Sequence, residues 1–203
     1  MQRLWLSLCF CGVAFVVTSA SAEPTLFSAT IAPGGTCAIT FNPAGTLTLD
    51  STNASSAIDA TSPPILSIKK TTLMLTSCTG WSGGRTPTLT VSGPTSRDNK
   101  VMANRQFLLK SEDDAGGNSK GFGFVMGKAE TGIIDWDTGG ATGMYSFTYP
   151  VDLPLAEPGT TLANNTTKDI YFGLSCGTSA SCASANVSAG TLKATLTFAF
   201  AYK

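Results

Sequence analysis

The segment that decides the fold covers residues 190–203 and reads GTLKATLTFAFAYK. Every second position in it carries an apolar side chain, in the row Leu192, Ala194, Leu196, Phe198, Phe200 and Tyr202. Threonine, lysine and alanine fill the alternate positions. A period of two over this length predicts a β-strand with one buried face. A strand at this place in the sequence has to find a partner on each side, or it offers an open edge to other chains.

The first 22 residues predict a secretory signal peptide. Arg3 gives a positive start, and residues 4–17 are an uninterrupted apolar run. Ala20 and Ala22 then supply the small residues of an A-x-A cleavage site. The apolar run is too short for a transmembrane helix. We therefore expect residues 1–22 to be removed and the chain to be exported.

The remaining residues, 23–203, are of the size of a single domain. Charged residues make up 13% of the sequence and the formal net charge is zero, whereas soluble domains usually contain about 25% charged residues. The sequence has no basic stripe, which argues against nucleic acid as a partner. A surface rich in threonine and poor in charge fits a β-rich secreted protein, or one that packs against copies or partners.

Four cysteines follow the predicted cleavage site, namely Cys37, Cys78, Cys176 and Cys182. An even number of cysteines behind a secretory signal indicates disulfides, and four cysteines allow three connectivities. We favour the pairing of nearest neighbours, Cys37 with Cys78 and Cys176 with Cys182. In the chain-entropy model, the first of these bonds is worth roughly 4 kcal/mol. A zinc site is disfavoured, since the sequence contains no histidine and no C-x-x-C motif.

The whole of residues 26–203 reads as short alternating runs with turn residues between them. No window shows a helical period. This pattern predicts an all-β fold in which two sheets pack as a β-sandwich. The expected strands are 26–31, 37–41, 46–49, 72–78, 88–93, 106–109, 121–126, 145–153, 169–174 and 191–202.

The sequence lacks histidine, and its cysteines after the cleavage site are expected to be paired in disulfides, so the residues that most catalytic sites need are not at hand. Without histidine the common general base and the usual catalytic triads are absent, and the paired cysteines leave no thiolate. Two acidic clusters, 112–114 and 135–137, could be calcium ligands or a glycosidase pair. The interpretation we favour is that they are solvated turn residues. We expect no enzymatic activity, no metal and no cofactor.

Trp81 and Trp136 fall in predicted loops. Aromatic side chains in loops can stack on sugars, so these two are the candidate ligand-binding residues. The favoured alternative is that each tryptophan covers an end of the core.

Three features together resemble the pilin subunits of bacterial chaperone–usher fimbriae. Cys37 and Cys78 stand where the disulfide of that family joins the first strand to the second. Residues 73–78 are similar to the family's alternating strand that ends in the second cysteine. At the C-terminus, Gly190, the alternating apolar row and the penultimate aromatic Tyr202 are similar to the pattern that the chaperones of this system recognise. The resemblance covers most of residues 26–203.

The resemblance implies an immunoglobulin-like sandwich that lacks its final strand. In the family, a strand from the periplasmic chaperone and then from the next subunit fills the resulting groove, and an outer-membrane usher exports the fibre. Here it implies a groove lined by Gly190 and the apolar row 192–202. The implied location is the cell-surface fimbrium, where a host glycan or protein can serve as receptor.

The sequence departs from the family in two places. The pair Cys176 and Cys182 is extra, and we interpret it as a local staple. The second departure concerns the N-terminal extension that family pilins donate to a neighbour. If residues 27–31 form the first sheet strand, only Glu23 to Leu26 precede it, which is too short to span a groove. This predicts a minor or tip subunit that accepts a strand and donates none. The alternative is a free secreted binding module, such as a small lectin, with a complete sandwich.

Overall fold

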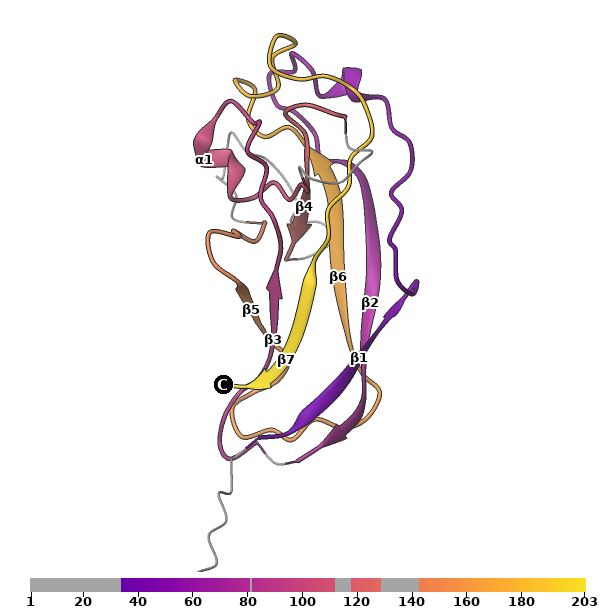
Figure 1. The fold of residues 1–203 in the computed structure, drawn as a ribbon, viewed down its shortest axis with the longest axis vertical. Coiled ribbons are helices and arrows are strands. Elements are labelled where there is room, and N and C mark those ends of the chain that lie inside the picture. Colours follow the sequence, from indigo (N-terminus) through magenta and orange to yellow (C-terminus); the bar gives the residue numbers. More distant parts are fainter. Residues whose placement is uncertain (1–33, 81, 112–117, 129–142) are drawn as a thin grey trace, which may run out of the picture. The chain divides into compact units, whose positions relative to one another are not determined.

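The computed structural model describes residues 34–80, 82–111, 118–128 and 143–203 (Figure 1). They belong to a compact unit, Pro33–Lys203, whereas the other unit, Met1–Ala32, lies outside them. The predicted signal peptide and the predicted strand 26–31 are therefore not among the described residues. Seven strands and two single-turn helices lie along the described chain: β1 (Thr36–Asn42), η1 (Ala54–Ser56), β2 (Leu66–Thr79), β3 (Pro87–Ser92), α1 (Met102–Arg105), β4 (Gly123–Gly127), β5 (Val151–Pro154), β6 (Thr166–Ser175) and β7 (Thr197–Tyr202).

The strands form two antiparallel sheets, so the fold is all-β as predicted. One sheet has the order β1-β2-β6-β4 and the other has the order β5-β3-β7. The 14-residue strand β2 is long enough to pair with two neighbouring strands. Its C-terminal half pairs with β1 and most of its length pairs with β6. In Figure 1 these two pairings appear as the long neighbouring ribbons of β2 and β6, with β1 crossing below.

One hydrophobic core is shared by the two sheets. Alternate residues of β2 are fully buried, among them Leu73 and Leu75, and they meet Leu89 and Val91 from β3. The period of two in the sequence therefore places one face of each strand in the core. The other buried members come from β4, β5, β6 and the loops, namely Leu109, Met126, Phe147, Val151, Leu153, Leu162, Ile170 and Phe172.

A second, smaller cluster fills the end of the molecule drawn uppermost in Figure 1. It joins Ala57, beside η1, to the disulfide Cys176–Cys182 and to Phe122 and Val187. The loops at this end thus have a small hydrophobic core of their own. It holds in place loop segments that are not hydrogen-bonded into either sheet.

Two predicted strands and the first half of a third are not strands. Residues 46–49 are irregular, and 106–109 contains a turn and two isolated bridges at Leu109. In the predicted strand 145–153, residues 145–149 are irregular and the second half is part of β5. In 46–49 and 145–149 alternating side chains do pack on the core, as Leu47 and Tyr145 show. In 106–109 the adjacent Leu108 and Leu109 are both fully buried. Alternation of apolar and polar residues in the sequence indicates which side chains are buried. A segment can bury every second side chain without forming backbone hydrogen bonds to a neighbouring strand. None of the helices in the described part of the chain is long and apolar enough to cross a membrane.

Candidate functional site

The candidate site is the pair of sheet edges formed by β1 and β7. Across the described residues, β1 is hydrogen-bonded only to β2, and β7 only to β3. The two strands belong to different sheets, yet some of their Cα atoms lie within 8 Å of each other. An edge strand presents unpaired N–H and C=O groups, which makes it a template for another strand.

The predicted apolar row of residues 192–202 is present but incompletely buried. Only Tyr202 is buried, with 7% of its surface exposed. The alternate residues from Thr191 to Ala199 are exposed, so the two faces differ as the sequence predicts. The remaining members of the row are half-buried, namely Leu192, Ala194, Leu196, Phe198 and Phe200.

Strand β1 presents a matching row. Cys37, Ile39 and Phe41 are half-buried and pack against the core, while the residues between them are exposed. Phe41 meets Phe198 of β7 edge to face, with ring centroids 4.8 Å apart and an interplanar angle of 61°. The rows on β1 and β7 therefore face each other at the margin of the core, and they touch at this aromatic pair.

The two edges run in opposite directions. At the start of β1, a Cβ atom placed on Gly35 would lie 2.6 Å from Cε2 of Tyr202 and would also collide with the carbonyl oxygen of Thr79. At the other end of β1, Phe41 contacts Phe198. Glycine is thus required at position 35 by the close approach of Tyr202 and β2. The approach holds the end of β7 against the start of β1.

The first half of the predicted terminal strand does not belong to the sheet. The ladder of β7 begins at Thr197, whereas the prediction placed its start at residue 191. Loop segments hold residues 190–196 instead. Ser111 N donates to Lys193 O at 2.9 Å, Ser119 N donates to Thr191 O at 3.0 Å, and Thr191 N donates to Asn118 Oδ1 at 2.7 Å. The alternation of side chains continues through this half without a paired strand.

The other predicted terminal feature, Gly190, has a packing role. A Cβ atom on Gly190 would lie 2.7 Å from Ser119 N and would collide with Oδ1 of Asn118. Glycine therefore allows the chain to pass close to Asn118 before it enters the apolar row. Gly190 itself is exposed and contributes no side chain to that row.

The end of β7 is fixed by polar contacts. Leu162 N donates to the hydroxyl of Tyr202 at 3.2 Å, and the ring of Tyr202 stands edge to face on Phe200, with centroids 5.2 Å apart. Lys203 Nζ lies 2.6 Å from Asp152 Oδ1 on β5. Hydrogen bonds from Lys203 and Thr90 lower the pKa of Asp152 below its ordinary value. Tyr202 is therefore an anchor as well as a member of the apolar row.

The structure contains the two disulfides of the nearest-neighbour connectivity. Cys37–Cys78 joins β1 to β2, with a Cα separation of 4.1 Å. It lies at the N-terminal end of β1, where the ladder with β2 has a register shift. Because β1 has no other sheet neighbour among the described residues, this bond fixes the outer wall of the candidate site to the rest of its sheet.

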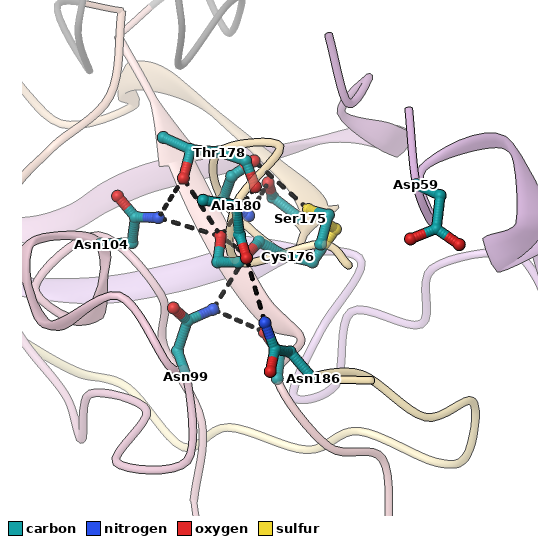
Figure 2. Close-up of a disulfide and its surroundings, with 12 residues drawn as sticks. Asp59, Asn99, Asn104, Ser175, Cys176, Thr178, Ala180 and Asn186 are labelled. Atoms are coloured by element: carbon teal, nitrogen blue, oxygen red, sulfur yellow. Dashed lines mark hydrogen bonds between the residues drawn. A yellow bond between two sulfur atoms is a disulfide. The ribbon is translucent and has the colours of Figure 1, made fainter. Parts of the chain in front are cut away.

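Cys176–Cys182 lies in the loop after β6 and is fully buried (Figure 2). Two buried asparagines from another part of the chain reach into this loop. Asn99 Nδ2 donates to Cys176 O and to Gly121 O, each at 2.8 Å. Asn104 Nδ2 donates to the hydroxyl of Ser181 at 3.0 Å. Figure 2 shows Asn99 and Asn104 directed at the loop from one side, while Asp59 stands apart on the other.

An ion pair between a buried lysine and a half-buried aspartate lies close to this loop and was not predicted. Lys110 Nζ lies 2.5 Å from Asp98 Oδ2 and also donates to Ser119 O at 2.7 Å. Burial by itself would raise the pKa of Asp98, but hydrogen bonds from Lys110, Ser96 and Gly121 N outweigh burial and hold that pKa below its ordinary value. The pair fixes residues 96–98 to the segment around Ser119, which in turn holds residues 190–191.

Several predicted residues lie outside the described residues. They are Trp81, Trp136 and the acidic clusters 112–114 and 135–137. Within the described ranges, no three histidine, cysteine or carboxylate side chains are grouped in a way that could hold a metal ion.

No protein-family model matches the sequence, and no curated protein matches it either.

Proposed function

We propose that the protein is a structural or adhesive subunit of a chaperone–usher fimbria, and that it accepts a β-strand from another chain along the free side of β7. The observation that carries the proposal is the pair of facing, half-buried apolar rows on β1 and β7. Added to the resemblance of the cysteine and C-terminal patterns, this arrangement fits an immunoglobulin-like sandwich that lacks one strand. The proposed mechanism is non-covalent assembly, without catalysis.

The energetics favour a strand over a small ligand. Complete burial of a large apolar side chain is worth about 1.5–3 kcal/mol, so covering an exposed fraction of up to about a third is worth at most roughly 1 kcal/mol for each. Leu192, Leu196, Phe198, Phe200 and Phe41 are only partly buried, and together they represent at most about 5 kcal/mol. An added strand captures this gain because its own side chains alternate in the same way, and its backbone satisfies the free edge of β7.

The assembly partners follow from this role. A periplasmic chaperone first covers the acceptor site, an outer-membrane usher exports the subunit, and another fimbrial subunit then replaces the chaperone strand. The predicted signal peptide leads the chain into this route, and the destination is the extracellular fimbrium. Cysteines paired in two disulfides are consistent with an oxidising compartment. A host glycan or protein is the proposed receptor.

The position within the fimbria stays a prediction. It depends on residues 27–31 being the first strand of a sheet, and that segment lies outside the described residues. Purified protein that polymerises by itself would exclude a tip subunit, because self-polymerisation needs a donor as well as an acceptor.

The acceptor role can be tested with two neighbouring substitutions in β7. Phe198→Asp places a charge in the half-buried row, whereas Thr197→Asp places the same charge on the exposed face of the same strand. Both variants are co-expressed with a candidate chaperone from the same genome, and the periplasmic complex is quantified after affinity purification. Phe198→Asp should abolish the complex, and Thr197→Asp should leave it close to the wild-type yield. A normal yield for Phe198→Asp contradicts the acceptor site.

A second measurement separates a fimbrial subunit from a free secreted binding module. The wild-type chain is expressed without any chaperone. A stable, monomeric product that does not bind strand peptides would favour the free binding module. Degradation or aggregation that co-expression of a chaperone prevents would support the fimbrial subunit.

A further inference from the structure

The two most exposed large apolar side chains in the described part of the chain lie on either side of one glutamine. Tyr149, in the loop before β5, is 79% exposed, and Met102, on α1, is 75% exposed. Gln106 continues α1 in a helical conformation, so it lies one turn after Met102 on the same face. Phe147 N donates to Gln106 O at 2.7 Å and joins the loop before β5 to the end of α1. Tyr149 and Met102 therefore flank Gln106.

Three side-chain oxygens form a triangle at this place. Ser146 Oγ lies 3.0 Å and Thr148 Oγ1 lies 2.5 Å from Gln106 Oε1, and the two hydroxyl oxygens are 3.1 Å apart. Gln106 Nε2 donates to Ala103 O at 3.3 Å, which orients the amide with its oxygen toward the hydroxyls. Each hydroxyl has one proton, and the amide oxygen has none. Two protons are thus available for three contacts, so the oxygen triangle favours a hydrogen-bond donor from outside.

The ring of Tyr149 stands beside the oxygen triangle. Tyr149 directly follows Thr148, and Pro150 restricts its backbone. The side chains of this patch carry no charge, and they are Met102, Gln106, Ser146, Thr148 and Tyr149. Two cations close by in the sequence are engaged elsewhere. Arg105 Nε donates to Asn99 O at 2.9 Å, and Lys128 lies over the ring of Tyr145.

We propose that this patch binds a neutral pyranose. One face of a pyranose ring presents C–H groups that stack on an aromatic side chain such as Tyr149. Its hydroxyl groups donate to the oxygen triangle and supply the proton that the triangle lacks. An apolar peptide side chain would leave the triangle without a donor, and an acidic or basic sugar would find no opposite charge in the patch. The site involves neither β1 nor β7, so it is independent of strand acceptance.

A glycan array tests this site on the mature full-length protein. The protein carries a fluorescent label and is applied to immobilised neutral oligosaccharides and to their sialylated forms. The neutral oligosaccharide that retains the most protein is then titrated in solution by NMR to obtain its Kd. We expect neutral glycans to be bound, with no gain in affinity from the added sialic acid.

Four substitutions then locate the site. Tyr149→Ala should weaken binding of that oligosaccharide about tenfold, whereas Tyr149→Phe should keep most of the affinity because the ring remains. Thr148→Val keeps the shape of the side chain without its hydroxyl, and it should also cost about tenfold in affinity. Thr167→Val is the matched control, since Thr167 is likewise exposed but lies on β6. Its Kd should equal that of the wild type.

Each result has a definite meaning. If no immobilised glycan retains the protein, or if Tyr149→Ala and Thr148→Val bind like the wild type, the proposed site is wrong. A preference for sialylated glycans would contradict the neutral class of ligand. All four variants should form the chaperone complex at the wild-type yield, because none of them changes β1 or β7. Loss of sugar binding is therefore distinguishable from failure of the fimbrial role.

Discussion

The buried side chain of Asn99 supports the sharpest prediction about stability. None of its surface is exposed. Its amide donates to the carbonyl oxygens of Gly121 and Cys176, each at 2.8 Å, and its Oδ1 accepts from Val101 N at 3.1 Å. Each hydrogen bond has a net worth of about 1 kcal/mol, and the carbonyl of Gly121 adds to the cost because it loses this donor, whereas Cys176 O keeps the hydroxyl of Ser181. We expect Asn99→Ala to lower the free energy of unfolding by about 3 kcal/mol.

Asn104 provides the matched control. It is 4% exposed and its amide donates to two hydroxyl groups, of Thr178 and Ser181. The hydroxyl of Ser181 already donates to Cys176 O at 2.6 Å, so Asn104→Ala leaves no carbonyl without a partner, and the expected loss is that of its two hydrogen bonds, about 2 kcal/mol. Urea unfolding with the disulfides oxidised measures both variants. Equal losses, or a loss below about 1 kcal/mol for Asn99→Ala, would refute the reasoning.

Further predictions concern the two disulfides and the ion pair between Lys110 and Asp98. Replacing Cys37 and Cys78 by serine should lower the free energy of unfolding by about 4 kcal/mol, and replacing Cys176 and Cys182 by about 2 kcal/mol, because the chain-entropy term grows with the sequence separations of 41 and 6. Urea midpoints of the two double variants measure the difference, and the reverse order would contradict this reasoning. The pKa of Asp98 is lowered in the folded state, so its contribution to stability is present above the unfolded pKa and is lost as the pH falls below about 4. When the pH is lowered from about 5 to about 3, the urea midpoint of the wild type should therefore fall by more than the urea midpoint of Asp98→Asn. Parallel pH profiles of the two proteins would contradict a stabilising role of the Asp98 carboxylate.

Much of the sheet structure could be predicted from alternation. Strands β1, β3 and β6 lie within two or three residues of their expected positions, and the buried face of β2 has the predicted parity. These strands have long runs of one parity and turn residues at their ends. Strand β2 begins six residues before its predicted start, at Leu66. Its sequence there reads LSIKK, and a register shift between Leu66 and Lys69 disturbs the alternation.

The depth to which the apolar rows on β1 and β7 are buried could not be predicted from the sequence. Alternation predicts which side chains share a face, but it does not predict how deeply that face is covered. Leu192 and Leu89 look alike in the sequence, yet Leu89 is fully buried and Leu192 is not. The difference in burial between the two leucines is set by how many strands lie beside each leucine, and this number depends on the order of strands in the sheet. Likewise, the extent of β7 depends on loop groups such as Ser111 and Ser119, which replace a strand partner.

The polar network around the second disulfide had no visible signal in the sequence. Asn99 and the carbonyl of Cys176 are 77 residues apart. An asparagine in a polar loop looks like a turn residue, and Lys110 looks like a surface lysine, until the fold brings their partners to them. Each became recognisable only through burial, since a buried polar side chain has to be paired.

The position of the Cys37–Cys78 bond has a mechanical consequence. In the fimbria that we propose, a fibre held between a cell and a surface would be under tension, and the pull would reach each subunit through its chain. Tension applied on the N-terminal side of Cys37 meets only the pair Thr36 and Thr79 and then the covalent bond to β2 before it reaches the continuous ladder from Ala38 to Asn42. The disulfide transfers the load to the 14-residue strand β2. Most of the length of β2 is paired with β6, so the two strands share the load. Strand β1 would thereby be protected from separating from β2 at that end, and one wall of the proposed acceptor site would keep its shape under tension.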